Sequence, residues 1–157
     1  MNKFNILALD TALKTGWATR IDGHIESGVQ DFTKRRGESN GLMFMRFNAW
    51  LEEMTQFRHI KYDLIVFERA HHRGGYATEI GVGLTTRVQE FAERIHAEYM
   101  AVHTATLKKF ITGSGKASKD DMMLWFWKIT GRKPQSDDEA DALGLLYFAC
   151  REVGIKL

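Results

Sequence analysis

Apolar residues gather in short runs separated by polar segments, a pattern typical of a protein that mixes strands and helices. Five segments have the length and composition of strands: residues 4–9, 17–21, 24–30, 64–67 and 99–103. The second and third flank Asp22-Gly23, a pair that strongly favours a two-residue hairpin turn. The fourth, Leu64 to Phe67, is apolar without interruption, as expected for a strand covered on both faces of its sheet.

Helical periodicity fills the intervals between these strands. A helix is predicted from about Glu38, because its Met and aromatic residues repeat on one face: Met43, Phe47, Trp50, Met54 and Phe57. A second helix carries apolar residues from Ile80 to Ile95, and three more helices are predicted over residues 104–111, 118–129 and 136–151. The order β-β-β-α-β-α-β-α-α-α predicts an α/β fold, in which an antiparallel hairpin edge leads into a sheet completed by helical crossovers.

Composition narrows the class of protein. The 157 residues are 44% apolar and 27% charged with one proline, which predicts a single globular domain over residues 1–157. One cysteine, Cys150, excludes an internal disulfide and fits a reducing compartment. The longest apolar run, Ala142 to Cys150, is too short to span a bilayer, and the N-terminus lacks signal-peptide features. We therefore expect a cytoplasmic protein that does not associate with membranes.

The net charge of +2 hides an uneven distribution. Residues 1–100 are neutral, residues 101–135 carry seven basic against two acidic side chains, and residues 136–157 carry two against five. A +5 segment beside a −3 segment is consistent with a polyanion substrate next to a cation site. A solvated helix face beside an unrelated helix cap is the alternative interpretation.

Two carboxylates end apolar strands, where packing gives them no role. Asp10 follows the first strand and Glu68 follows the fourth. Either residue alone could be a turn or capping carboxylate. Because the ends of neighbouring strands in an open α/β sheet converge on one crevice, the two together favour a shared site.

The last helix adds further acids. Ser136 and Glu139 fit a capping box, and Asp137 suits the positive end of the helix dipole. Asp141 lies past the first turn among apolar residues, so capping does not explain it. Asp138 and Asp141, at i and i+3, point the same way, while Asp137 and Asp141, at i and i+4, form the competing pair.

If Asp10, Glu68, Asp138 and Asp141 meet, they cannot all stay ionised unaided, because neighbouring like charges raise one another's pKa. A divalent cation removes that conflict. Oxygen ligands without a Cys/His cluster select a hard ion such as Mg²⁺ or Mn²⁺ over Zn²⁺. Two such ions about 4 Å apart are the usual arrangement for in-line displacement at a phosphodiester.

Four segments resemble, in order and spacing, the motifs of RuvC-type Holliday junction resolvases. They are Ile6-Leu7-Ala8-Leu9-Asp10, Leu64-Ile65-Val66-Phe67-Glu68, the lysine–glycine segment from Lys108 to Lys119, and Asp138-Glu139-Ala140-Asp141-Ala142-Leu143. The third, which follows the pattern K-x-x-x-x-G-x-G-x-A-x-K, is the most specific. The strand-end acids alone would fit any ribonuclease H-like nuclease.

The resemblance implies a ribonuclease H-like fold with a mixed five-stranded sheet flanked by helices. It also implies a homodimer, with the helix over 80–95 as a suggested contact, whose two active sites nick opposed strands of a four-way DNA junction. The family's four acidic metal ligands map onto Asp10, Glu68, Asp138 and Asp141, and two important basic residues map onto Lys108 and Lys119.

The chain also departs from the family pattern. Thr11-Ala12 replaces the Pro-Gly that usually follows the first aspartate in bacterial members. His71-His72 stands where an aromatic residue often contacts bases at the junction centre, which weakens any carry-over of that contact and of cleavage-sequence preference. These departures and the short chain resemble a phage-encoded member more than the housekeeping enzyme.

Several smaller patterns bear on DNA contacts. The segment around Gly113-Ser114-Gly115-Lys116 fails the Walker pattern, and Gly81-Val82-Gly83 is at most a helix-packing feature. Ser118 with Asp121 predicts a helix cap, which makes Lys116 and Lys119 candidates for holding a phosphate. An exposed polar face is the alternative for these lysines.

The loop after Glu68 is basic and contains two histidines. We predict that His71 and His72, with Arg69 and Arg73, contact DNA strands, although surface histidines often have no function. Cys150 is expected to be a core residue.

The sequence therefore predicts a Mg²⁺-dependent, structure-selective endonuclease that resolves four-way or branched DNA by paired nicks and leaves 5′-phosphate and 3′-hydroxyl ends. Lys119 would stabilise charge on the phosphate, and Lys108 and Lys116 would position the backbone. A ribonuclease H or flap-type nuclease of the same fold and a non-catalytic junction-binding module are the alternatives. The length excludes two-domain kinases, which share a strand-end aspartate.

Overall fold

The computed structural model describes residues 3–55 and 59–157. Phe57, the last member of the predicted Met and aromatic stripe, lies outside these ranges. The elements follow the predicted order: β1 (Ile6–Asp10), β2 (Lys14–Ile21), β3 (His24–Asp31), α1 (Asn40–Glu53), β4 (Leu64–Glu68), α2 (Gly75–Arg94), β5 (Glu98–Val102), α3 (Thr104–Thr112), α4 (Lys119–Thr130) and α5 (Asp137–Glu152).

The strands form one mixed sheet in the order β3-β2-β1-β4-β5. β1, β2 and β3 pair antiparallel, whereas β4 pairs parallel to both β1 and β5. Asp22 and Gly23 make the hairpin turn with φ of 49° and 88°, the left-handed values that a two-residue turn requires. The predicted five-stranded sheet with an antiparallel hairpin edge is confirmed.

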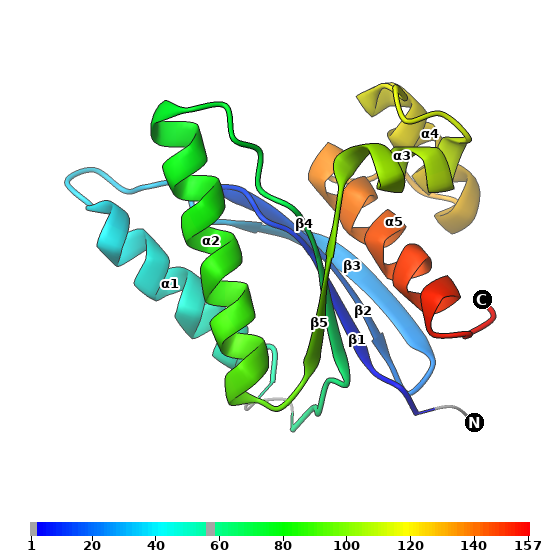
Figure 1. Cartoon of the computed structure of the whole chain (residues 1–157), viewed down its shortest axis with the longest axis horizontal. Helices are drawn as coiled ribbons and strands as arrows, with labels where there is room; N and C mark the ends of the chain where they lie inside the picture. The colour runs from blue at the N-terminus through cyan, green and yellow to red at the C-terminus, as the bar shows by residue number, and fades with distance from the viewer. Residues whose placement is uncertain (1–2, 56–58) are drawn as a thin grey trace.

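Helices cover both faces of this sheet, with α1 and α2 on one side and α3, α4 and α5 on the other (Figure 1). Side chains along β1 alternate between two cores: Leu7 and Leu9 pack with the residues of α1 and α2, and Ile6 and Ala8 pack with those of α5. The apolar residues of β4, Leu64 to Phe67, alternate in the same way, which confirms that this strand is covered on both faces.

The predicted stripe on α1 is core as far as the structure describes it, because Met43, Phe47, Trp50 and Met54 are all buried. α2 crosses α1 closely at Gly83, where an added Cβ would lie 2.3 Å from the ring of Phe44. Of the two glycines in Gly81-Val82-Gly83, Gly83 therefore has the predicted helix-packing role.

Several predicted boundaries differ from the structure by one to three residues, and two of these differences have a clear cause. β2 begins at Lys14, three residues early, because its N-terminal part continues the ladder with β3 opposite Asp31. The fifth strand ends at Val102 rather than His103, because His103 is the N-cap of α3 and its Nδ1 accepts from the Ala105 amide at 3.3 Å.

Cys150 is buried among the apolar residues of α5, as predicted. Among the described residues, no helix combines the length and hydropathy needed to cross a membrane.

The topology determines where the chemistry lies. β1 and β4 are parallel neighbours, so both end at the same edge of the sheet with Asp10 and Glu68 as their last residues. β5 ends at this edge too, and α3 starts two residues later. The N-terminal part of α5 packs beside the edge, which brings its acids to the two strand ends.

Candidate metal centre

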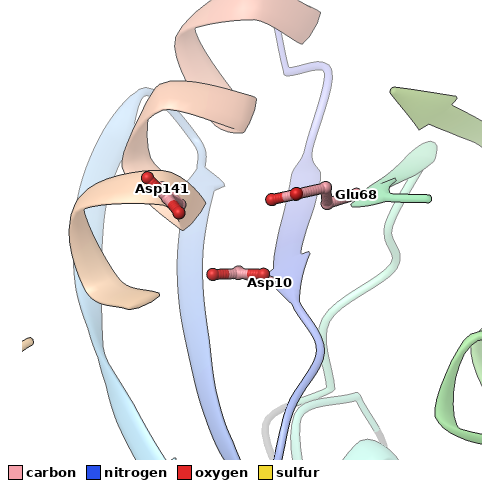
Figure 2. Close-up of side chains that lie close together, drawn as sticks. All are labelled: Asp10, Glu68 and Asp141. Atoms are coloured by element: carbon pink, nitrogen blue, oxygen red, sulfur yellow. The ribbon is translucent and has the colours of Figure 1, made fainter. Parts of the chain in front are cut away.

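Three carboxylates converge at the shared edge of β1 and β4. One ligand oxygen each from Asp10, Glu68 and Asp141 lies within 4.8 Å of the other two. Figure 2 shows the three side chains pointing toward one another from β1, β4 and α5. We call Asp10, Glu68 and Asp141 the carboxylate cluster. The predicted convergence of the two strand-end acids is thus present in the structure.

The two aspartates that compete as the fourth acid make different contacts. Asp138 is not one of the three acids whose ligand oxygens lie within 4.8 Å, but it lies close enough to Asp10 that its charge and side chain raise the Asp10 pKa. Asp137 points to α4, where its Oδ2 lies 3.1 Å from the Lys119 Nζ. The geometry therefore favours Asp138 over Asp137 as the fourth acid of the site.

Burial and mutual repulsion perturb the acids of this site. Burial, followed by the charges of Glu68 and Asp141, raises the pKa of Asp10 well above its ordinary value. Burial and the charge of Glu68 raise the pKa of Asp141 from 3.8 to about 7, against which Lys108 acts to lower it. Burial and the charge of Asp137 raise the pKa of Asp138. All three shifts are in the direction expected for negative charges held close together and away from water.

The donor set fits a hard divalent cation. The three acids of the cluster, with Asp138 beside Asp10, offer carboxylate oxygens, and burial together with mutual repulsion raises the pKa of Asp10 and of Asp141. Oxygen-only donors suit Mg²⁺ or Mn²⁺.

A predicted local feature at the start of α5 is wrong. The Ser136 side chain makes no capping bond to the helix, and Glu139 does not reach back to it. Glu139 is fully buried, and its carboxylate accepts from the Gln135 amide at 2.6 Å, from Arg132 at 2.5 Å and from the Ser27 hydroxyl at 2.7 Å. The nearby guanidinium competes successfully for the carboxylate, so Glu139 anchors α5 to β3 rather than capping the helix.

The sequence contains a signal for this buried role that the capping pattern obscures. Glu139 lies on the same helical face as Leu143 and Leu146, at i+4 and i+7, and both leucines are buried. A buried acid on the apolar face of a helix requires a charged or hydrogen-bonding partner, here Arg132.

A glycine that sequence reasoning did not single out lets α5 approach the sheet. A Cβ on Gly16 in β2 would lie 1.9 Å from the backbone oxygen of Asp138. No larger residue fits while α5 keeps its position, so Gly16 helps to set where Asp138 and Asp141 stand. A glycine inside a strand is the available signal, because it often marks such a close approach.

Glu68 has two partners outside the cluster. The Thr104 hydroxyl donates a short hydrogen bond to Glu68 Oε1, and His71 Nε2 lies 3.3 Å from the same oxygen. Thr104 Oγ1 and His71 Nε2 are 3.0 Å apart. Nothing in the sequence pattern pointed to Thr104, which is brought to Glu68 only by the pairing of β4 with β5.

The acids line a cavity of about 650 Å³ with basic residues on its walls. Five of the predicted DNA contacts line it: Arg69, His71, Arg73, Lys108 and Lys119. His72 and Lys116 are exposed on the surface and are not part of the lining. Lys14 and Tyr76, which the sequence analysis did not single out, do line it.

The predicted cap of α4 is confirmed. Ser118 Oγ accepts from the Asp121 amide at 3.1 Å, and the Ser118 amide donates to Asp121 Oδ2 at 2.9 Å. Lys119 therefore begins α4 at the cavity wall. Its hydrogen bond with Asp137 raises the pKa of the Lys119 ammonium, so this residue stays charged.

Sequence comparison finds RuvC proteins. The chain is 30% identical over 104 residues to the crossover junction endodeoxyribonuclease RuvC of Corynebacterium glutamicum, which covers 64% of this chain and 44% of the relative. It is 31% identical over 110 residues to that of Corynebacterium diphtheriae, covering 66% and 61%. The chain thus spans about half the length of the curated relatives it matches. No protein-family model matches it.

Structural comparison covers nearly the whole chain. The RuvC structure of Thermus thermophilus matches with a TM-score of 0.70 at 18% identity, over 96% of this chain and 97% of the other. T. thermophilus RuvC in complex with Holliday junction substrate matches with a TM-score of 0.74 at 16% identity, over 95% and 96%. The fold is therefore the ribonuclease H-like fold of these proteins.

Proposed function

We propose that this chain, a relative of the RuvC-type resolvases in sequence and in fold, is a divalent-metal-dependent endonuclease that cleaves four-way or branched DNA. The observation that carries the proposal is the carboxylate cluster, whose three ligand oxygens lie within 4.8 Å of one another at the strand ends. A cavity with basic walls surrounds the cluster, which suits a phosphodiester backbone. One nuclease unit over residues 1–157, acting in the cytoplasm, completes the proposal.

The acids Asp10, Glu68, Asp138 and Asp141 would hold the metal, which we propose to be two Mg²⁺ ions, with Mn²⁺ as a substitute. Such ions, when bound, supply charge to the scissile phosphate and lower the pKa of an attacking water. The in-line attack would leave a 5′-phosphate and a 3′-hydroxyl.

The basic residues of the cavity have distinct positions in this proposal. Lys119, held by Asp137 beside the acids, is placed to neutralise charge on the phosphate that reacts. Lys108 also lines the cavity, close enough to lower the pKa of Asp141, and would position the backbone together with the more exposed Lys116. These contacts carry no base information, so they predict binding that weakens steeply with salt.

The loop after β4 would guide the DNA strands away from the acids. Arg69 and Arg73 line the cavity, and His72 is exposed beside them. His71 is turned toward Glu68, so its first role is inside the site.

Paired nicking requires two sites, and each chain carries one carboxylate cluster in its described residues. We therefore propose a homodimer. The apolar stripe of α2 is not its contact surface, because Ile80, Leu84, Val88 and Phe91 are buried against the chain's own sheet and α1. A dimer that uses α2 would have to use the opposite face of the helix.

The test compares cleavage of a mobile four-way junction, a linear duplex and an RNA–DNA hybrid in Mg²⁺. We expect cleavage of the junction, and an Asp10→Asn variant that binds the junction without cutting it. Cleavage of the hybrid alone would instead support a ribonuclease H, and junction binding without cleavage would support a non-catalytic binding module.

A further inference from the structure

We propose that Thr104 and His71 are positioning residues that hold Glu68 in its metal-binding orientation. This inference rests on the proposed function in one respect, the assignment of Glu68 as a metal ligand. Neither residue belongs to the acidic set, and Thr104 belongs to no motif of the chain.

The first support is the pair of contacts that Glu68 Oε1 makes. Thr104 and His71 both contact Oε1, and they also contact each other, with 3.0 Å between Thr104 Oγ1 and His71 Nε2. In this proposal the other oxygen, Oε2, would bind the cation. The Glu68 side chain extends from β4 toward Asp10 and Asp141 (Figure 2). A glutamate has three rotatable side-chain bonds, so fixing one oxygen removes most of the freedom that metal binding would otherwise have to restrict.

The second support is how the backbone delivers the hydroxyl. Glu68 pairs with Val102 across β4 and β5, and the Arg69 amide donates to the Val102 carbonyl at 2.9 Å. α3 starts two residues after Val102, so Thr104 enters the site from a strand directly bonded to the one that carries Glu68. The position of the hydroxyl relative to the carboxylate is therefore set by a paired ladder rather than by a free loop.

The third support is the companion residue on the same helix face. Lys108 lies at i+4 from Thr104, and both line the cavity. Lys108 acts electrostatically on Asp141, whereas Thr104 hydrogen-bonds Glu68. α3 thus contributes one group to each side of the carboxylate cluster.

The test measures metal binding directly, by electron paramagnetic resonance of free Mn²⁺ during titration of the full chain without DNA. Thr104→Val keeps the shape and loses the hydroxyl, so we expect Mn²⁺ affinity to fall roughly ten- to a hundredfold. Thr104→Ser restores the hydroxyl, and we expect its affinity to lie within about threefold of the wild type. Thr106→Val, on the exposed side of α3, is the matched control and should bind Mn²⁺ as the wild type does.

His71→Ala supplies a second variant that does not depend on packing, because the His71 side chain is 51% exposed. Its Mn²⁺ affinity should fall several-fold, in the same direction as that of Thr104→Val. For both variants the turnover of branched DNA should fall, and for Thr104→Val the junction affinity measured without metal should stay unchanged. That split separates a positioning role from a general loss of structure.

Unchanged Mn²⁺ affinity in Thr104→Val, or a Thr104→Ser variant as weak as Thr104→Val, would overturn the inference. A wild-type protein that binds Mn²⁺ and shows the predicted variant series, yet cuts no branched DNA, would overturn the proposed function and leave the inference standing. A wild-type protein that binds no Mn²⁺ would overturn both.

Discussion

Replacing Asp141 with asparagine is expected to stabilise the metal-free protein at neutral and alkaline pH, while it abolishes cleavage. The reason is that Asp141 is partly buried beside Glu68, Asp137 and Asp138, which together with burial raise its pKa from 3.8 to about 7. The folded chain therefore binds this proton more tightly than the unfolded chain does. Stability consequently falls as pH rises from about 4 to about 7 and stays low above that range.

The magnitude follows from the shift in the Asp141 pKa. A tenfold change in proton affinity corresponds to about 1.4 kcal/mol, so a pKa moved from 3.8 to about 7 costs roughly 4 kcal/mol of unfolding free energy above pH 7. Asparagine recovers only part of this, because its amide is also partly buried and because the remaining acids redistribute their protons. We expect a gain of about 1–3 kcal/mol at pH 8 and close to none at pH 4.

Urea unfolding in EDTA at pH 4, 6 and 8 measures this gain as the difference between variant and wild type. Asp22→Asn, in the exposed hairpin turn, removes a carboxylate of the same type and should show no pH-dependent difference. Mg²⁺ at a hundredfold excess over its Kd should stabilise the wild type by about 2.7 kcal/mol and remove the advantage of the variant. A variant equal to or less stable than the wild type at pH 8 in EDTA would refute the reasoning.

Three further substitutions test other parts of the site. Gly16→Ala places a Cβ 1.9 Å from the Asp138 backbone oxygen, so thermal unfolding should show a loss of about 1–3 kcal/mol and cleavage should fall strongly. Arg132→Ala leaves the fully buried Glu139 without its cation, and urea unfolding should show a loss of about 1–3 kcal/mol. Lys119→Ala should leave the melting temperature unchanged and reduce cleavage. The slope of log binding constant against log salt concentration for the junction should become shallower by about one, as for the loss of one phosphate contact.

Each of these has a matched control. Gly41→Ala adds a Cβ whose nearest neighbour is 3.6 Å away and should stabilise α1 slightly. Arg94→Ala removes a side chain about as exposed as that of Arg132, but its partner Glu52 is 27% exposed, so the loss should stay below about 1 kcal/mol. Lys128→Ala removes an exposed charge elsewhere on α4 and should leave cleavage intact. If a control variant lost as much stability or cleavage as its test variant, the role assigned to the tested residue would be wrong.

The sequence predicts the sheet and the positions of its acids well because both depend on local patterns. The apolar runs that end on Asp10 and Glu68, and the Asp22-Gly23 turn, determine strand number and hairpin register without any tertiary information. Parallel pairing of β1 and β4 then brings the two acids together. The basic loop that follows Glu68 likewise has to lie near the cavity.

The residues that sequence reasoning missed act across distant segments. Thr104 reaches Glu68 only after β5 pairs with β4. Gly16 matters only because α5 packs so closely on β2 that a Cβ at this position would lie 1.9 Å from the Asp138 backbone oxygen. Glu139 looked like a capping residue because the capping pattern is local, whereas Ser27 and Arg132, which bind it, lie in β3 and in the segment before α5. Contacts set by tertiary packing leave little trace in local spacing.

Mapping the nicks on a four-way junction tests whether the carboxylate cluster cleaves branched DNA with a bound divalent cation. We expect wild-type protein with Mg²⁺ to make paired nicks on opposed strands, and Asp10→Asn to make none. DNA ligase should reseal the nicks, because their ends are 5′-phosphate and 3′-hydroxyl. Cleavage that persists in EDTA or in Asp10→Asn, or an intact junction with both Mg²⁺ and Mn²⁺, would contradict this role of the cluster.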